Sequence, residues 1–218
     1  MIAAAAVAAA GALICLDPGH GTPPAIGRQT EPIGPGSHVM KIKDGGGAHG
    51  EAAVALAIAQ RARAVLIARG YRVAMTRTGP TIHLADGNGN IARARFCNRR
   101  HAALMVRIHA DGSGDRSLHG VSTLVPARRR GWTDDIYARS LRAGVRMQRA
   151  VVSSTGALDR GIVKRSDLTG FNWANVPAVL VETGFLTNPA DWRSLHTAAY
   201  QQRVAVGVAN GVRAFVSP

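Results

Sequence analysis

The sequence predicts one α/β domain, with a twisted, mostly parallel sheet of about six strands and helices on both faces. Two patterns carry this prediction. Short, continuous apolar runs alternate along the chain with longer segments of helical periodicity, and such runs are typical of strands buried on both faces. The length of 218 residues and the hydrophobic fraction of 46% also suit a single domain with a sizeable core.

The start of the chain differs from the remainder. Residues 1–11 are rich in Ala and resemble part of the apolar region of a signal peptide, although the basic start is missing. The apolar run is also shorter than the about 20 residues needed to cross a bilayer. We interpret 1–11 as a signal-peptide remnant or N-terminal extension, and 12–218 as the folded domain. No transmembrane segment is expected.

The first strand, at 12–16, ends at an Asp-Pro-Gly turn, and residues 22–48 then contain several Pro and Gly. We expect 22–48 to be a loop. Loops longer than about 15 residues in a compact domain are usually functional or disordered. Because this one leads directly to Glu51, we expect it to form the rim of an active site. An amphipathic helix is expected at 51–69, where Gly70 ends it.

Alternating strands and helices complete the domain. The expected strands are 71–76, 103–109, 119–125, 177–182 and a short one at 161–164, and the expected helices are 86–101, 133–152, a short helix opened by Asn188-Pro189, and 200–215.

Four segments bring side chains that bind metals or transfer protons. They are Leu16-Asp17-Pro18-Gly19-His20-Gly21, Gly50-Glu51, Ile108-His109-Ala110 and Val181-Glu182-Thr183-Gly184-Phe185. His20, His109 and Glu182 are expected at or just beyond strand ends, where ligands bind in parallel sheets. Two His and one Glu form the three-ligand set of a catalytic zinc site, whose fourth position holds water. A second Glu is then free to act as a base.

Each residue alone also has a structural interpretation. His20 lies in a turn, and Glu51 begins a helix, where the macrodipole favours a carboxylate in any case. Glu182 is harder to explain, because it closes an apolar run and is costly to bury unless paired or near a metal. His38 and His49 lie between the first two candidate ligands and are rival ligands.

Taken together and in this order, the segments resemble the zinc-dependent N-acetylmuramoyl-L-alanine amidase family of the amidase 3 type. The resemblance covers essentially the whole chain. It implies that His20, Glu51 and His109 hold one Zn²⁺ and that Glu182 is the catalytic carboxylate. The implied reaction is hydrolysis of the amide between N-acetylmuramic acid and the L-alanine of the stem peptide, in cell-wall remodelling, cell separation or lysis. Further matches are Arg93, Asn98, Gly120-Val121 and the block 177–189.

The sequence departs from the family pattern in the long segment 22–48. Some relatives insert a helix after the fourth strand that blocks the site, whereas here 128–135 passes directly into the next helix. We therefore expect an open groove. No wall-binding repeat is appended, so binding to an anionic cell wall would depend on the net charge of +14, including Arg128-Arg129-Arg130 and Lys164-Arg165. These clusters are equally interpretable as solvated turns.

Peptidoglycan and muropeptides are the expected partners of an extracytoplasmic, monomeric enzyme that binds no specific nucleic acid. Two alternatives remain: a zinc hydrolase acting on another amide, and a non-catalytic module that binds cell wall or nucleic acid. The second is disfavoured by the few aromatic residues and the lack of a basic recognition helix.

Cys15 and Cys97 either pair in an oxidising compartment or are two buried free thiols.

Overall fold

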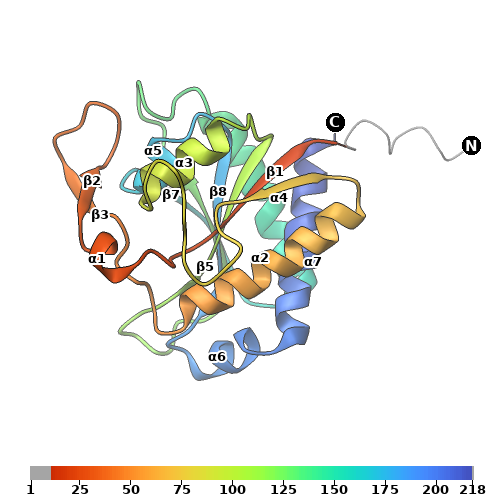
Figure 1. Ribbon diagram of the computed structural model, residues 1–218. Coiled ribbons are helices and arrows are strands. Elements are labelled where there is room, and N and C mark those ends of the chain that lie inside the picture. Colours follow the sequence, from red (N-terminus) through yellow and green to blue (C-terminus); the bar gives the residue numbers. More distant parts are fainter. Residues whose placement is uncertain (1–10, 218) are drawn as a thin grey trace, which may run out of the picture.

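A six-stranded sheet forms the centre of the molecule, as the sequence predicts (Figure 1). The structure is a computed structural model that describes residues 11–217, so most of the predicted 1–11 extension lies outside the described residues. The strand order is β4-β1-β5-β8-β6-β7, and β6 runs antiparallel to β8 whereas the other neighbours are parallel. The strands are β1 (Leu13–Pro18), β4 (Arg72–Met75), β5 (Leu104–Asp111), β6 (Val121–Pro126), β7 (Asp159–Arg165) and β8 (Ala178–Phe185).

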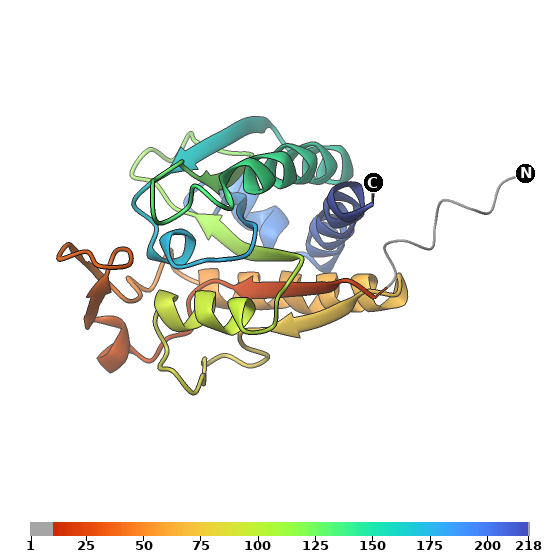
Figure 2. The ribbon, with the colours of Figure 1, turned by 90° about the horizontal axis from the view of Figure 1, so that it is seen from above.

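Helices cover the two faces of the sheet unequally (Figure 2). Three long helices, α2 (Glu51–Ala68), α4 (Tyr137–Thr155) and α7 (Ala198–Val216), pack on one face and on one another. The other face carries α3 (Asn90–Asn98) and the short α5 (Thr169–Asn172). The remaining helices are α1 (Pro24–Gly27) and α6 (Pro189–Leu195). No helix of the described chain is long and apolar enough to span a membrane.

Side-chain alternation along the strands divides the core into two layers. Leu16 and Ile108 belong to the core under the long helices, whereas Cys15 and Met105 belong to the core under α3 and α5. Successive side chains of a strand point to opposite faces. The polar residues Asp17, His109 and Glu182 therefore share the face that α3 and α5 cover only in part, and this leaves room for a site there.

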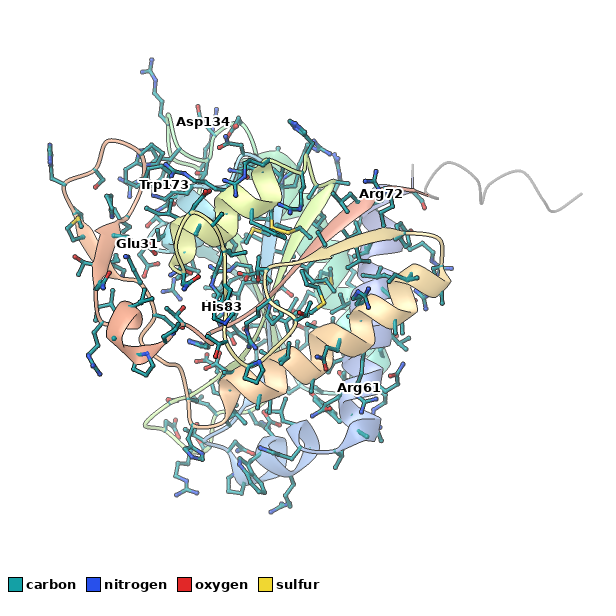
Figure 3. The ribbon with its side chains drawn as sticks, in the orientation of Figure 1. Glu31, Arg61, Arg72, His83, Asp134 and Trp173 are labelled. Carbon is teal, nitrogen blue, oxygen red and sulfur yellow. A yellow bond between two sulfur atoms is a disulfide. The ribbon has the colours of Figure 1, made fainter. Side chains whose placement is uncertain are left out.

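The segment 22–48, predicted as a loop, differs from that expectation. It contains α1 and an antiparallel hairpin of β2 (Thr30–Pro32) and β3 (Met40–Ile42). The buried carboxylate of Glu31 accepts hydrogen bonds from the backbone N–H groups of Asn90 (2.7 Å) and Ile91 (3.2 Å), and so caps α3. Trp173 Nε1 donates to the carbonyl of Pro32 at 3.0 Å. Both anchoring side chains are labelled in Figure 3, and together they attach the hairpin to α3 and α5.

Two predicted helices begin later than expected. The expected helix at 86–101 begins at Asn90, because 84–88 form a turn in which the Asn88 side chain accepts from the Leu84 N–H at 3.0 Å. The expected helix at 133–152 begins at Tyr137. Before it, the Thr133 hydroxyl bonds both the Arg129 N–H and the Ala127 carbonyl, which holds a turn. Polar side chains that bond nearby backbone compete with helix at both places.

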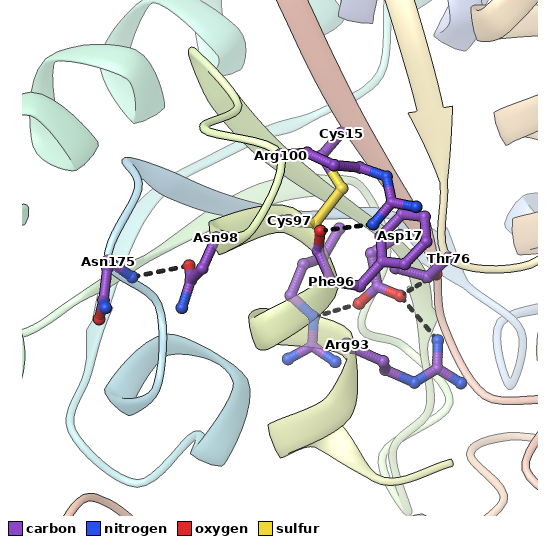
Figure 4. The surroundings of a disulfide bond; sticks show 10 residues. Cys15, Asp17, Thr76, Arg93, Phe96, Cys97, Asn98, Arg100 and Asn175 are labelled. Atoms are coloured by element: carbon purple, nitrogen blue, oxygen red, sulfur yellow. Dashed lines mark hydrogen bonds and ion pairs between the residues drawn. A yellow bond between two sulfur atoms is a disulfide. The ribbon is translucent and has the colours of Figure 1, made fainter. Parts of the chain in front are cut away.

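A disulfide joins Cys15 of β1 to Cys97 of α3, 82 residues apart (Figure 4). Of the two alternatives for these cysteines, the structure therefore has the paired one. Both residues are fully buried, and the bond fixes α3 against the sheet. α3 carries Arg93, whose side chain reaches the turn that follows β1.

Candidate metal and catalytic site

The structure brings the three predicted ligands together. His20 follows β1, Glu51 is the first residue of α2, and His109 lies near the end of β5. Glu51 Oε1 is 2.9 Å from His20 Nε2 and 2.8 Å from His109 Nδ1. One donor atom from each residue lies within 4.8 Å of the others, and this is the one such group found in residues 11–217. His38 and His49 are exposed and lie outside the group.

The turn that carries His20 is held by two guanidinium groups. Arg93 donates to the carbonyls of Pro18 (2.9 Å) and His20 (2.5 Å), and Arg77 donates to that of Gly19 (2.7 Å). His20 has a φ of 58°, which is uncommon for a residue other than glycine. Such conformations cluster at functional sites, where the surroundings enforce them. The paired hydrogen bonds of Arg93 supply that enforcement.

Gly19 permits the close approach of two strands at this point. A Cβ on Gly19 would lie 2.5 Å from the His109 ring, so any side chain there would displace the imidazole. Gly47 has a similar role on the other side, because its Cβ would lie 2.5 Å from His20 Nε2. The backbone of Gly19 therefore lies directly against the His109 ring, and the backbone of Gly47 lies directly against the His20 ring.

Asp44 is a member of the site that the sequence analysis missed. Its Oδ1 lies 2.6 Å from His20 Nδ1, and its carboxylate also accepts from the N–H groups of Gly46 (2.8 Å) and Thr22 (3.2 Å). A carboxylate on the second nitrogen of a histidine fixes the tautomer and the ring orientation of a metal ligand. Asp44 follows the hairpin, in a segment without periodicity, and no sequence signal connects it with His20.

The electrostatics of the cluster suit a cation. Burial disfavours protonated His20, but its hydrogen bonds to Asp44 and Glu51 outweigh this and raise the pKa of His20 to about 9. Burial likewise opposes ionisation of Glu51, but hydrogen bonds from His109 and His20 lower the pKa of Glu51 to about 2. Burial lowers the pKa of His109, which favours the neutral imidazole. The carboxylates of Asp44 and Glu51 therefore face the imidazoles of His20 and His109. Because His109 is neutral, the cluster has an excess of negative charge, which favours a bound cation.

The donor set fits zinc. Two imidazoles and a carboxylate are the ligands of many catalytic zinc sites. His109 Nε2 is buried and has no hydrogen-bond partner in the described chain, as expected of a ring held for a purpose other than protein hydrogen bonding. His20, Glu51 and His109 are the residues that would hold the ion.

Glu182 faces this cluster from the neighbouring strand. It pairs in register with His109, is 9% exposed, and its Oε2 has no hydrogen-bond partner in the described chain. Burial, followed by the charges of Asp111 and Glu51, raises the pKa of Glu182 well above its usual value. β8 continues to Phe185, so Glu182 lies within the strand instead of at its end. A bulge after His109 locally shifts the register between β5 and β8.

A cavity of about 580 Å³ joins these groups. Its lining includes all three predicted ligands, Glu182, and the apolar side chains of Leu124 and Leu180. None of its lining residues comes from 128–135, the segment that leads into α4. His49 also lines this cavity, whereas His38 does not.

The fold and the site together define a class, single-domain α/β proteins in which a His-Glu-His group able to bind a metal ion faces a second Glu. A family model described as N-acetylmuramoyl-L-alanine amidase (Amidase_3) matches residues 14–214. The chain belongs to this family.

Individual relatives agree with the family match. An N-acetylmuramoyl-L-alanine amidase of Mycobacterium tuberculosis is 30% identical over 95% of this chain and 88% of its own length. The amidase AmiA of Salmonella typhimurium is 28% identical over 92% of this chain and 74% of its own. Among solved structures, an N-acetylmuramyl-L-alanine amidase from Mycobacterium smegmatis superimposes with a TM-score of 0.85, at 28% identity, over 95% of this chain and 98% of that one.

Proposed function

We propose that this protein is a zinc-dependent hydrolase of peptidoglycan that cleaves the amide between N-acetylmuramic acid and the L-alanine of the stem peptide. The observation that carries the proposal is the His20–Glu51–His109 group facing Glu182 in one cavity. Family membership supplies the bond that is cleaved. The alternative of a non-catalytic binding module leaves a buried, unpartnered Glu182 beside this group unexplained.

The reaction requires a carboxylate that can both accept and donate a proton. Zinc, when bound, supplies Lewis acidity toward water and toward the amide carbonyl. Glu182 accepts the proton of the attacking water and returns it to the leaving nitrogen of L-alanine. A buried carboxyl with a raised pKa suits both steps, because proton transfer is most effective when the pKa lies near the working pH.

The other residues of the site position these groups. Asp44 orients the His20 ring, and Arg93 holds the backbone on which that ring is carried. Thr183 donates from its hydroxyl to the carbonyl of His109 at 2.8 Å, which ties the residue after Glu182 to the neighbouring ligand strand. The ligand set and the catalytic carboxylate are therefore held at a fixed separation by hydrogen bonds as well as by the sheet.

An extracytoplasmic location is the setting we propose for this activity. The Cys15–Cys97 disulfide supports it, because disulfides persist mainly in oxidising compartments. The formal charge of +14 further favours association with anionic polymers of a cell wall.

Replacement of the catalytic carboxylate tests the proposal. Glu182→Gln should lower the rate of hydrolysis of purified peptidoglycan at least about 100-fold, the typical contribution of a positioned acid–base group. The variant should keep one zinc per chain, measured by elemental analysis. Mass spectrometry of wild-type digests should show intact stem peptides with a free L-alanine amino group. His38→Ala, at an exposed rival ligand, is the matched control and should retain both zinc and activity.

Three results would contradict the proposal. Full activity of Glu182→Gln would remove the role of that carboxylate, and activity that survives chelation and dialysis would remove the role of zinc. Products cleaved within the stem peptide, with the link to N-acetylmuramic acid intact, would instead support a hydrolase of another amide.

A further inference from the structure

One arginine lines the catalytic cavity, and the mechanism above does not use it. Arg165 is the last residue of β7 and shares the cavity with Glu182, Glu51 and Asp111. Apart from imidazoles, the charged groups of the lining are these three carboxylates and the single guanidinium. Arg165 forms no ion pair with any of the three in the described structure. Its carboxylate partner is Asp167, which does not line the cavity.

The guanidinium of Arg165 is held in one orientation. Nε and Nη2 donate in parallel to the two carboxylate oxygens of Asp167, each at 2.7 Å. Such a bidentate pair fixes the plane of the guanidinium. Lys41 Nζ of β3 lies 3.7 Å from the same carboxylate, so the hairpin also contributes to this arrangement.

Part of Arg165 remains free to bind. No group of the described chain accepts a hydrogen bond from its Nη1, and the side chain is 37% exposed. Its hydrogen bonds to Asp167, and then the charges of Glu182 and Asp111, raise its pKa, so the guanidinium remains charged. A preoriented cation with free donors, beside the reacting groups, is suited to an anionic part of the substrate.

The chemistry of the stem peptide offers one such group near the scissile bond. L-alanine is followed by a γ-linked D-glutamate, whose α-carboxyl group is either a free carboxylate or a carboxamide. When free, it is the first negative charge on the leaving peptide, within two residues or about 7 Å of chain from the cleaved amide.

We propose that Arg165 binds this α-carboxylate and makes the enzyme prefer stem peptides in which it is free. The inference rests on the proposed amidase function and names the substrate group that the cavity recognises. A carboxamide offers one acceptor oxygen and no charge, so it replaces the ion pair poorly. Asp167 is the positioning residue, because it orients the guanidinium without contacting the substrate.

The test compares two synthetic substrates, N-acetylmuramoyl-L-alanyl-D-glutamate with its γ-carboxyl capped as a methylamide, and the same compound with its α-carboxylate replaced by a carboxamide. The cap removes the γ-carboxylate charge, which the bond to the third residue removes in the stem peptide. The wild-type enzyme should cleave the free acid with a kcat/KM about tenfold higher, the factor that corresponds to one charge-assisted interaction. Arg165→Gln should bring the ratio of the two kcat/KM values close to one, because it lowers kcat/KM for the acid alone. Asp167→Asn should reduce the ratio in part. Lys164→Gln is the matched control, because that exposed side chain lies over the Tyr137 ring outside the cavity lining, and it should keep the wild-type ratio.

Binding to an inactive variant separates this inference from the proposed function. Zinc-loaded Glu182→Gln should bind the acid about tenfold more tightly than the amide in calorimetry, and Glu182→Gln/Arg165→Gln should bind both equally. An equal preference in the wild type, or a preference that survives Arg165→Gln, would overturn the role of Arg165. If the wild type cleaves neither substrate but the binding ratio holds, the proposed reaction fails and the carboxylate site stands.

Discussion

At the scale of single residues, the site depends on hydrogen bonds that orient its side chains. His20 is held at its backbone by Arg93 and at its ring by Asp44, so neither its position nor its tautomer is left free. The candidate ligands were predictable because each lies in a short motif at an element boundary. Asp44 was not, because its role depends on a contact across 24 residues that no local pattern encodes.

Asp44→Asn should weaken zinc binding about 10- to 100-fold, the usual cost of losing an outer partner of a metal ligand. In the wild type, a His20 pKa of about 9 means that this ring must lose a proton to bind zinc at neutral pH. Zinc affinity should therefore rise as the pH increases from 7 toward 9. In Asp44→Asn that dependence should be shallower, because one of the two carboxylates that raise the His20 pKa is gone and only Glu51 remains.

Competition with a chromophoric chelator between pH 6.5 and 9 measures both effects. Asp115→Asn, at a fully exposed aspartate, is the control and should reproduce the wild-type curve. A variant that binds zinc as tightly as the wild type, with the same pH dependence, would show that Asp44 does not act through His20.

At the scale of elements, the hairpin is the feature that the sequence could least predict. The four inner strands β1, β5, β8 and β6 were predictable because they are mostly buried runs, whereas the edge strand β7 is largely exposed and was predicted only as a short strand at 161–164. β2 and β3 are three residues long and are stabilised by distant partners, Asn90 and Trp173 among them. The same is true of α5, a single turn packed under the sheet. Elements that depend on tertiary contacts leave little periodicity to detect.

Glu31→Gln should detach the hairpin from α3 in part. The variant loses the charge at the helix N-terminus and one of two acceptors, at an expected cost of about 1 kcal/mol in the free energy of unfolding. Hydrogen exchange should accelerate at the N–H of Lys43, which bonds the Gln29 carbonyl across the hairpin. Because Asp44 follows directly, zinc affinity should also fall.

Val39→Ser, at a side chain 60% exposed in the hairpin, is the matched control and should change neither measurement. Unchanged exchange at Lys43 in Glu31→Gln, with stability equal to the wild type, would show that the hairpin is held without this cap.

At the scale of the whole molecule, a buried charge cluster joins the sheet to α3 beside the disulfide (Figure 4). Asp17 is fully buried and accepts from Arg93 (2.7 Å), Arg107 (2.8 Å) and the Thr76 hydroxyl (2.5 Å). Burial alone would raise the pKa of Asp17, but the two arginines and Thr76 hold it far below its usual range. The sheet, α3 and the turn before His20 therefore share one network.

This network makes global stability depend on pH. The unfolded Asp17 binds a proton near pH 3.9, whereas the folded carboxylate does not, so its stabilisation is complete above about pH 5 and is lost as the pH falls. Asp17→Asn should lower the free energy of unfolding by about 3–5 kcal/mol at pH 7, because it leaves two buried guanidinium groups without a counter-charge. Between pH 4 and 3 its stability should also fall less steeply than that of the wild type, by up to about 1.4 kcal/mol per pH unit. Urea titrations at several pH values measure both quantities. Asp135→Asn, at an exposed site, should follow the wild type, and parallel curves for Asp17→Asn and the wild type would show that Asp17 is not the group whose protonation weakens the fold.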